Sequence, residues 1–592
     1  MAEFFTKDDK RTVYCGELRT SDIGKEVTVC GWIQRRRDLG SLIFIDLRDK
    51  SGIVQLAFDD ATDKEVFEKA FTCRSEYVLS AKGSVRARSS VNKNIPTGEI
   101  EIFVTSMKVL SEADTLPFEI GENYNAGEEI ALKYRYLDLR RPALQKNIFM
   151  RNEITRIARQ YFYSNNFTEI ETPMMIKATP EGARDYLVPS RIHKGCVYAL
   201  PQSPQIYKQL LMIAGYDRYI QIARCFRDED LRADRQPEFT QIDFEMSFAT
   251  QEDVMNINEG LMAKLFDEIL GVKLELPLPR MTYAEAMSRY GSDKPDTRFG
   301  MEIQDISNIV AASGFGVFEG AVNNGGSVRA IVVKGGASTL SRKEIDKLTE
   351  HAKGIGAKGL AYIRFVDETP NCSFAKFISP ETLNAIMESI DCRRGDVALI
   401  VADANRVVLP VLGALRLKIA KQLSMIPDKF NFVWITEFPF FEWNEETQHW
   451  DAMHHPFTMP MEECLPLLES DPGAVRAKAY DLVLNGVELL SGSIRITDWK
   501  LQEKMFDALG LTKEEIAAKF GFLVDAYKYG APPHGGSGMG LDRLTMVMSG
   551  AESLRDVVAF PKVQNASEPM SQCPAPADEQ AYRDLGIAIV KE

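Results

Sequence analysis

The sequence predicts an α+β protein of several domains: a small β-barrel, a larger domain organised around an antiparallel hairpin, and an α/β domain inserted into the latter. Three observations support this. The chain has 592 residues, whereas a single domain usually holds about 100–200. Five short extended runs separated by turn residues fill residues 27–104. Two alternating segments flank one highly charged loop between residues 219 and 248.

Composition excludes several other classes of protein. Hydrophobic residues make up 45% and charged residues 26% of the chain, so disorder, collagen and coiled coil are excluded as its main architecture. No apolar run approaches the about 18–20 residues that cross a bilayer, and the first residues lack the apolar core of a secretory signal. The nine cysteines form no CxxC pair, which argues against a disulfide framework or a structural zinc site. We therefore expect a cytoplasmic protein without a membrane partner, in which any metal is Mg²⁺ on carboxylates.

Charge is distributed unevenly. The net charge is −14, yet residues 1–110 carry 18 Lys and Arg against 17 Asp and Glu, so the remaining residues carry −15. An acidic protein binds nucleic acid poorly without specificity, because that affinity comes from neutralising phosphates. The near-neutral first module, with its triplet Arg35-Arg36-Arg37, can still bind nucleic acid locally, although a solvated loop explains the triplet equally well.

The first domain, expected at 1–108, reads as a barrel. Turn residues separate five extended runs: Val27–Ile33, Leu42–Arg48, Gly52–Phe58, Tyr77–Arg88 and Glu99–Val104. Five strands in about 90 residues indicate an OB-type barrel, whose open face binds single-stranded nucleic acid.

Two side chains on this barrel are candidates for contact with a base. Side chains alternate across a strand, so Phe44 lies on the polar face of its run, opposite Ile43 and Ile45. A base can stack on such an aromatic ring. The amide of Gln55, on the next run, is placed to read a base edge. The alternative is that Phe44 belongs to the barrel core.

A linker is expected at 109–136, and the second domain at 137–287. Apolar residues at helical spacing, from Ile154 to Phe162, predict an amphipathic helix that stops at Asn165. The following run, Phe167–Pro173, reads as a strand whose terminal proline suits a sheet edge or an interface.

A long hairpin carries the strongest chemical signal. Tyr219–Arg227 is extended, residues 228–237 form a charged loop, and Phe239–Phe248 alternates, with Ile242, Phe244, Met246 and Phe248 on one face and Gln241, Asp243 and Glu245 on the other. We expect Arg227 to end its strand opposite Asp243 and Glu245. Its planar fork suits phosphate, and Phe239 can stack on a purine. A surface hairpin without a ligand remains the alternative.

A glycine-rich segment near the end, Gly535–Arg543, reads as a turn that enters a helix near Leu541. The helix amino terminus and Arg543 can hold phosphate. The segment is not a P-loop, since no Gly-Lys-Ser/Thr follows. It also does not match a dinucleotide fingerprint, because the spacing differs and no clear strand precedes it.

The stretch between hairpin and glycine-rich segment is too long for one sheet, so we expect an inserted α/β domain at 288–424, followed by the rest of the interrupted domain at 425–560 and a surface-wrapping extension at 561–592. The insert should contain the strands Val328–Lys334, Gly359–Val366 and Asp396–Asp403 and the helices Ser341–Gly354 and Pro380–Ile390. No catalytic role follows from its sequence.

These segments together resemble the class II aminoacyl-tRNA synthetases, and most closely the aspartyl enzymes of bacterial type. The resemblance covers nearly the whole chain and rests on Gly31–Gly40, Glu169–Pro173, Thr179–Asp185, Pro201–Lys208, Cys225–Asp230, Gln241–Glu245, His454–Thr458 and Gly535–Arg543. Pro201–Lys208 and His454–Thr458 are the more specific motifs, since the glycine-rich one is shared across much of the class.

The resemblance implies an antiparallel-sheet catalytic domain and a homodimer with Pro173 at its interface. It also implies the reaction: aspartate and Mg-ATP give aspartyl-adenylate and pyrophosphate, and the aspartate then passes to the 3′-terminal adenosine of tRNA-Asp.

Residue roles follow from the same resemblance. Arg227 on the α-phosphate and Arg543 on the γ-phosphate are implied as catalytic. The implied ATP contacts are Arg227, Asp228, Glu229, Gln236, Phe239, Glu488, Gly540, Leu541, Asp542 and Arg543, with Asp481 and Glu488 as magnesium ligands. The implied aspartate pocket contains Glu181, Ser203, Gln205, Lys208, Arg227, Asp243, His454 and Arg495. On the barrel, Arg35, Phe44 and Gln55 are expected to bind the anticodon, and Leu39 and Ser90 to choose between tRNAs.

Other activities stay open at this point. Arg495 and Lys208 favour aspartate over asparagine, because the amide of asparagine cannot satisfy a buried cation. The free-energy cost of leaving that charge unpaired is on the order of several kcal/mol. These two residues argue against a sister asparaginyl or lysyl activity. A silent RNA-binding protein is disfavoured by the intact Arg227, Arg543, Asp481 and Glu488. The remaining alternative is an enzyme that also charges tRNA-Asn, against which Leu39 leans.

Overall fold

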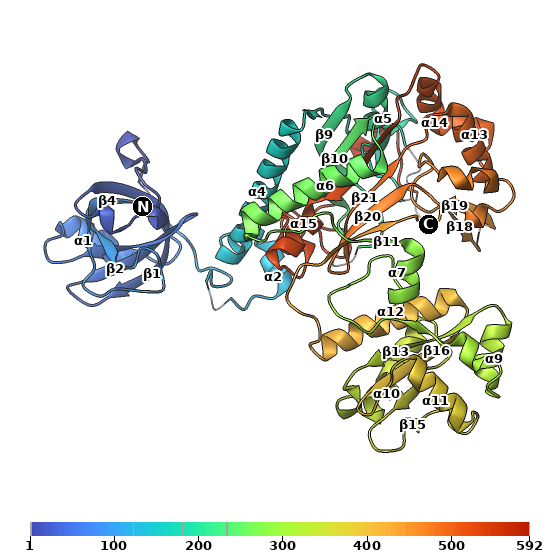
Figure 1. Ribbon diagram of the computed structural model, residues 1–592. Coiled ribbons are helices and arrows are strands. Elements are labelled where there is room, and N and C mark those ends of the chain that lie inside the picture. Colours follow the sequence, from blue (N-terminus) through green and yellow to red (C-terminus); the bar gives the residue numbers. More distant parts are fainter. Residues whose placement is uncertain (1–2, 122–123, 179–182, 232–234, 447, 591–592) are drawn as a thin grey trace. The chain divides into compact units, whose positions relative to one another are not determined.

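The computed structural model describes residues 3–121, 124–178, 183–231, 235–446 and 448–590 (Figure 1). It divides into two compact units, Met1–Ile148 with Ser567–Pro574, and Phe149–Ala566 with Ala575–Glu592. The division falls inside helix α4 (Pro142–Ser164), twelve positions after the expected boundary at 136. The reason is local: the Arg140 guanidinium binds Glu76 of the first unit at 2.8 Å and lies over the Trp32 ring.

The first unit contains the expected barrel. Its closed sheet has the order β1-β2-β3-β5-β4, formed by β1 (Glu26–Asp38), β2 (Ile43–Asp49), β3 (Gly52–Phe58), β4 (Val78–Ala87) and β5 (Ile100–Ser111). Ile43, Ile45 and Leu47 lie in its core. The helix α1 (Lys64–Thr72), which the sequence reading missed, joins β3 to β4, and the short α2 (Glu128–Lys133) and α3 (Arg135–Asp138) follow β5.

An eight-stranded sheet organises the second unit. Its order is β11 (Arg280–Thr282), β17 (Phe432–Thr436), β20 (Ala479–Leu484), β21 (Val487–Ile494), β22 (His534–Gly540), β10 (Glu238–Ser247), β9 (Arg218–Phe226) and β6 (Thr168–Glu169). Only the outer pairs β11–β17 and β6–β9 are parallel. The expected antiparallel hairpin is therefore β9–β10, near one edge of a larger antiparallel sheet.

Alternation along β10 places its apolar residues in the main core. Ile242, Phe244 and Met246 pack there with side chains of α4 and α6 (Gln251–Leu265). The expectation for Phe248 was wrong: β10 ends at Ser247, and Phe248 has a positive φ of 53° and is 76% exposed. The predicted strand Phe167–Pro173 is likewise short, only β6, because just two of its residues pair with β9.

The glycine-rich segment is a strand and not a turn. β22 lies between β21 and β10, which corrects the statement that no clear strand precedes the helix. Glycine is needed because a Cβ on Gly536 would lie 2.1 Å from the Phe244 carbonyl oxygen of β10. Four of the seven residues of β22 are glycine, so its sequence shows no hydrophobic alternation and does not predict a strand. The helix α15 (Leu541–Ser549) begins where expected.

Helices cover both sides of this sheet (Figure 1). α4, α6 and α15 contribute to the main core. A separate core joins α5 (Gln205–Ile213), α13 (Trp499–Ala508) and α14 (Lys513–Tyr527). Short hairpins, β7 (Leu187–Pro189) with β8 (Val197–Ala199) and β18 (Phe441–Asn444) with β19 (His449–Ala452), and the late helix α16 (Glu579–Leu585) complete the unit.

The inserted segment, which follows β11 and precedes β17 in the chain, forms a separate sheet. Its order is β12 (Gln304–Asp305), β13 (Ser327–Val333), β16 (Val397–Asp403), β14 (Ala361–Arg364) and β15 (Asn371–Cys372). Each neighbouring pair is antiparallel. The strands β13 and β14, on either side of β16, therefore run parallel to each other, and α10 (Arg342–Ile355) connects them. The other helices of the segment are α7 (Tyr283–Tyr290), which leads in, α8 (Ser307–Val310), α9 (Gly316–Asn323), α11 (Pro380–Ser389) and α12 (Asn405–Gln422). Among the residues that the structure describes, no helix is both long and apolar enough to traverse a bilayer.

Candidate active site

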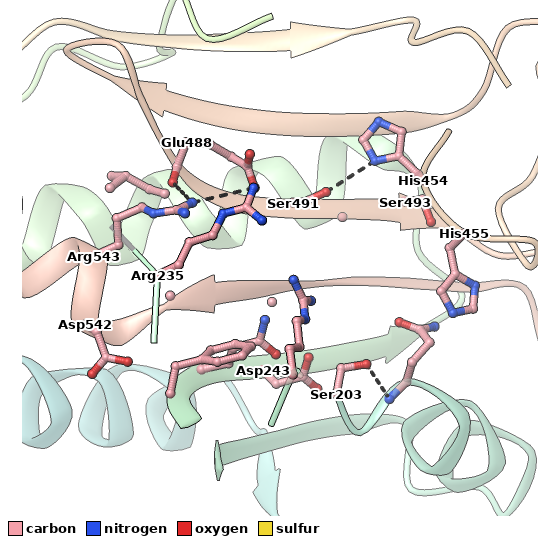
Figure 2. Close-up of a pocket in the computed structure, with 18 of the residues that line it drawn as sticks. Ser203, Arg235, Asp243, His454, His455, Glu488, Ser491, Ser493, Asp542 and Arg543 are labelled. Carbon is pink, nitrogen blue, oxygen red and sulfur yellow. Dashed lines mark hydrogen bonds and ion pairs between the residues drawn. The ribbon is translucent and has the colours of Figure 1, made fainter. Parts of the chain in front are cut away.

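A pocket of about 340 Å³ opens over β10, β21 and β22 (Figure 2). It gathers fourteen of the expected residues: Ser203, Gln205, Lys208, Arg227, Glu229, Gln236, Phe239, Asp243, His454, Glu488, Arg495, Gly540, Asp542 and Arg543. Gly492 and Gly538 line it as well. Since these glycines carry no side chain, they leave free space above the middle of the sheet.

The hairpin register differs from the expected one. Phe226, the last residue of β9, pairs with Glu238, whereas Asp243 pairs with Gln221 and Glu245 with Tyr219. Arg227 therefore lies at the loop end of the hairpin, not opposite the two acids. Antiparallel pairing causes this, because residues closest to the loop pair with each other. The Arg227 guanidinium carbon lies 5.2 Å from the Phe239 ring centre.

Charged side chains cluster at one end of the pocket, where Figure 2 shows Glu488, Arg543 and Arg235 together. Arg543 donates a hydrogen bond of 2.8 Å to the Glu488 backbone carbonyl, and Lys294 Nζ lies 2.9 Å from the Glu488 carboxylate. Arg235 binds Glu229 at 2.8 Å. We refer to this set, Arg235, Lys294, Glu488 and Arg543, as the nucleotide end. Its side chains are all partly exposed, so a polyanion can reach them.

Asp481 lies close enough to Glu488 and Lys294 of the nucleotide end to interact with their charges, but it does not line the pocket itself. It pairs with Ser491 across β20 and β21, and its Oδ1 atom is buried without a hydrogen-bond partner among the described residues. Burial, and then the charge of Glu488, raise the pKa of Asp481 well above its usual range. A buried carboxylate with an unused oxygen beside a second carboxylate has the ligand chemistry of a Mg²⁺ site.

At the other end, four charged side chains form a buried network. Lys208 Nζ lies 2.8 Å from Asp243 Oδ2 and 3.3 Å from Glu245 Oε2. Arg495 binds the same Glu245 through Nε at 2.9 Å and Nη2 at 3.2 Å. We call Lys208, Asp243, Glu245 and Arg495 the buried network. Its two cations and two anions compensate each other, as burial of charge requires.

The two acids of the buried network differ in pKa. Burial raises the pKa of Asp243, Lys208 opposes this, and the result is about 6. Burial would also raise the pKa of Glu245, but Arg495 and Lys208 outweigh it and hold the pKa at about 2. Asp243 is therefore the acid whose charge changes near neutral pH.

Two histidines close this end. Burial lowers the pKa of His454 to about 4 and that of His455 well below its usual value, so both rings are neutral. His454 Nδ1 lies 3.5 Å from the Ser491 hydroxyl. His455 Nδ1 accepts a hydrogen bond from the Phe457 backbone, while its buried Nε2 has no partner within the described part of the chain.

Several expected contacts are engaged elsewhere. Asp542 lines the pocket, yet its carboxylate binds Arg151 of α4 and accepts a hydrogen bond from the Thr240 backbone at 2.9 Å. The Gln236 amide exchanges hydrogen bonds with the Lys562 backbone at 2.8 and 3.1 Å. Asp228 and Leu541 do not line the pocket, and Leu541 packs in the main core. Glu181 lies outside the described residues.

Sequence reasoning missed several pocket residues. Arg235, Gln241, Lys294, His455, Thr458, Leu489, Ser491, Ser493 and Leu554 also line it, and Glu245 completes the buried network. The alternation of β10 had already placed Glu245 beside Asp243, so that signal existed. No sequence pattern indicated Lys294 as a pocket residue, because it lies in a loop nearly two hundred residues before its partner Glu488.

On the barrel, Phe44 is half-buried and stays out of the core, which excludes the core alternative. The guanidinium of Arg37 lies 5.7 Å from its ring centre and binds Asp46 and Gln55 at 2.9 and 2.8 Å. Gln55 is itself buried and also donates to Glu101 at 2.6 Å. Its amide can read a base only by giving up one of these partners. The other expected tRNA contacts are exposed: Arg35, Leu39 and Ser90.

Comparisons with known proteins agree with this geometry. Residues 127–564 match the family model of class II tRNA synthetases (D, K and N), and residues 27–110 match the OB-fold nucleic acid binding domain. The aspartate–tRNA ligase of Ruminiclostridium cellulolyticum is 58% identical over 98% of this chain and 99% of its own. The aspartate–tRNA(Asp/Asn) ligase of Caldanaerobacter subterraneus subsp. tengcongensis is 55% identical over 98% of each chain.

Solved structures support the fold. A putative aspartyl-tRNA synthetase from Leishmania major has a TM-score of 0.60 at 19% identity, covering 95% of this chain and 96% of its own. Asparaginyl-tRNA synthetase from Pyrococcus horikoshii, complexed with asparaginyl-adenylate, has a TM-score of 0.58 at 18% identity, covering 93% and 98%. The fold and the arginine-lined pocket agree with sequence identity above 50% over nearly the whole length of these relatives. The chain therefore belongs to the aspartate–tRNA ligases of the class II tRNA synthetase family.

Proposed function

We propose that this chain activates L-aspartate with Mg-ATP to form aspartyl-adenylate and pyrophosphate, and then transfers the aspartate to the 3′-terminal adenosine of tRNA-Asp. One observation carries the proposal: a single pocket joins a partly exposed cluster of cations to a buried and compensated charge network. The first suits a polyphosphate and the second a small zwitterion with an additional carboxylate.

The buried network selects the amino acid. Glu245 binds the Nε edge of Arg495 and so fixes the orientation of the guanidinium. Nη1, on the opposite edge, contacts Ser493 and is the donor left for the substrate's side-chain carboxylate. Asp243, whose Oδ1 atom lacks a partner among the described residues, accepts from the substrate ammonium. Asparagine offers Nη1 a neutral amide in place of a carboxylate and so loses the charge-assisted hydrogen bond, which costs about 1–3 kcal/mol.

The chemistry is attack of the aspartate α-carboxylate on the α-phosphorus of ATP, which displaces pyrophosphate. The substrate itself is the nucleophile, so the protein needs no nucleophile of its own. It positions two anions and stabilises the charge of the transition state. Arg227, which lines the pocket beside Phe239, contacts the α-phosphate, and Phe239 stacks on adenine. Arg543 contacts the γ-phosphate.

Asp481 and Glu488 are proposed to hold the Mg²⁺ that accompanies ATP. The unused Oδ1 of Asp481 and the accessible carboxylate of Glu488 fit a hard cation that prefers oxygen ligands. The metal, when bound, neutralises charge on the phosphates.

Transfer to tRNA uses the barrel as a second recognition site. Arg35 and Phe44 meet the anticodon, and Gln55 does so if it exchanges a partner. Relatives above 50% identity carry both names, aspartate–tRNA ligase and aspartate–tRNA(Asp/Asn) ligase, so charging of tRNA-Asn is the second candidate. The exposed Leu39 and Ser90 are the proposed positions of that choice, and Leu39 favours tRNA-Asp alone.

We also propose a cytoplasmic homodimer. Pro173 is exposed beside the edge strand β6, next to the exposed Met174 and Met175, which suits a subunit interface there. None of the nine cysteines, all of which lie in the described part of the chain, forms a disulfide, as is usual in a reducing compartment.

ATP–pyrophosphate exchange with each amino acid in turn tests the activation step. Exchange with aspartate alone is the expected result. Exchange with asparagine or lysine would point to a sister enzyme, and silence with all three to an RNA-binding protein without activity. Charging of purified tRNA-Asp and tRNA-Asn then separates the two ligase forms.

A further inference from the structure

The inserted domain begins with a loop that reaches the catalytic pocket. Residues 291–300 follow α7, and Lys294 of this loop lines the pocket. Its Nζ atom lies 2.9 Å from Glu488, and its side chain retains 41% exposure. The loop belongs to the segment for which no role was expected from the sequence.

Buried contacts fix this loop on the side of the inserted domain. Arg416, on α12, is 1% exposed. Its guanidinium donates to three loop carbonyls, those of Asp296, Phe299 and Gly300, at 2.7 to 3.1 Å. Gly291 approaches α12 so closely that a Cβ would lie 2.0 Å from the Leu409 carbonyl oxygen. The inserted domain therefore holds the loop from this side.

Contacts on the opposite side fix the loop against the catalytic sheet. The Asp296 side chain binds Arg298 at 2.7 Å and lies against Gly486, at the turn between β20 and β21; a Cβ on that glycine would lie 3.2 Å from Asp296 Cβ. Asn431, which precedes β17, donates to the Thr297 carbonyl at 3.3 Å. Lys294 thus extends from a backbone held on both sides, and its ammonium is directed at the pocket.

The carboxylate that Lys294 holds is the one proposed to bind Mg²⁺. An ammonium and a divalent cation cannot both occupy the same carboxylate oxygens at close range without strong repulsion. Arg543 and Arg235 lie at the same end of the pocket (Figure 2). The phosphates of ATP arrive at the nucleotide end together with the metal. A Lys294 side chain that is displaced from Glu488 can therefore pair with phosphate oxygens at the same end of the pocket.

We propose that Lys294 is a nucleotide-binding residue supplied by the inserted domain: it neutralises Glu488 while the pocket lacks ATP, and it pairs with the outer phosphates once Mg-ATP is bound. The proposal rests on the proposed function. It assigns one residue of the nucleotide end to the inserted domain. It also gives a reason for the three hydrogen bonds by which Arg416 of α12 fixes the loop.

The test compares Lys294→Met with Lys347→Met. Lys347 lies on the insert helix α10, and the ion pair recorded for it among the described residues is with Glu344 on the surface, so its replacement removes the same charge away from the pocket. Calorimetry measures the affinity of each purified protein for ATP and for pyrophosphate, with and without Mg²⁺. Exchange assays give KM for ATP and for aspartate.

We expect Lys294→Met to weaken ATP and pyrophosphate binding by about tenfold or more, the effect of one charge-assisted hydrogen bond. KM for aspartate should stay within about twofold, and the Mg²⁺ concentration for half-maximal exchange should fall, because Glu488 has lost its competing cation. Lys347→Met should match the parent protein, and Lys294→Arg should retain most of the nucleotide affinity.

Unchanged ATP and pyrophosphate affinities in Lys294→Met would overturn the proposal and leave Lys294 as a structural ion-pair partner only. Failure of the proposed function is distinguishable, since the parent protein would then show no aspartate-dependent exchange, while calorimetry would still report whether Lys294 contributes to nucleotide binding.

Discussion

The two ends of the catalytic pocket contain the same kinds of charged side chain in opposite environments. In the buried network, Lys208 and Glu245 are 2% and 0% exposed, and each charge has a partner. At the nucleotide end, Glu488, Arg543 and Arg235 keep 24%, 27% and 43% of their side-chain surface exposed. Buried pairs are rigid and intolerant of a wrong partner, whereas exposed ones exchange partners at little cost. The first environment suits selection of one small substrate, and the second suits repeated capture and release of a polyphosphate.

The largest effect is expected from the arginine proposed to contact the α-phosphate. Replacing Arg227 by alanine should lower kcat/KM for exchange by about 10³-fold or more, because the transition-state charge on the α-phosphate loses its cation. The measurement is ATP–pyrophosphate exchange, with circular dichroism and gel filtration as controls for fold and assembly. Near-normal exchange would remove Arg227 from the reaction.

A substitution in the buried network should lower both the stability of the protein and its use of aspartate. Arg495→Met leaves Glu245 buried and incompletely paired, which should cost about 3–5 kcal/mol of unfolding free energy and raise KM for aspartate by about 10³-fold. Urea unfolding and exchange assays measure the two effects. Adding Glu245→Gln should recover much of the stability without recovering aspartate use; recovery of both would show that Arg495 is structural.

A variant outside the pocket sharpens the contrast, since it should disturb neither end. Phe44→Ala on the barrel should raise KM for tRNA by about 10- to 100-fold, the loss of one stacked base, and leave exchange unchanged. Charging and exchange assays on the same preparation separate the two. An equal fall in both activities would make Phe44 a folding residue.

The smallest expected effect is a pH dependence that belongs to one end only. Asp243 has a raised pKa of about 6, so it becomes neutral as pH falls through 6 and loses its attraction for the substrate ammonium. The dissociation constant for aspartate should therefore rise by about tenfold per pH unit below that value. Glu245, with a pKa of about 2, stays charged throughout.

Calorimetric titration of aspartate between about pH 5 and 7 measures this effect, and the matched control is Asp243→Asn, in which the dependence should disappear. A flat profile in the parent protein would mean that Asp243 does not contact the ammonium.

Local sequence patterns predicted much of this architecture. The alternation of β10 correctly divided Ile242 and Phe244 from Asp243, because one face of a strand meets the core and the other meets the pocket. The same pattern placed Phe44 off the barrel core. Motif resemblance supplied the proposed roles of Arg227 and Arg543, which no periodicity indicates.

What the sequence could not provide depends on pairing over long distances. β22 has glycines where neighbouring strands need space, so its pattern is that of a turn. The hairpin register could not be read without knowing which residues adjoin the loop, and Arg227 was therefore placed beside the wrong partners. Lys294 and Glu488 meet only because two separate elements hold one loop.

The clamp of Arg416 on the loop has a consequence for protein engineering. A catalytic core shortened by removing residues 288–424 would lose both the loop and the helix that holds it. A shorter enzyme would have to retain residues 291–300 together with α12, joined by a new linker that replaces only the distal sheet. In this family member, the boundary of an independently removable module therefore lies inside the insert and not at its ends.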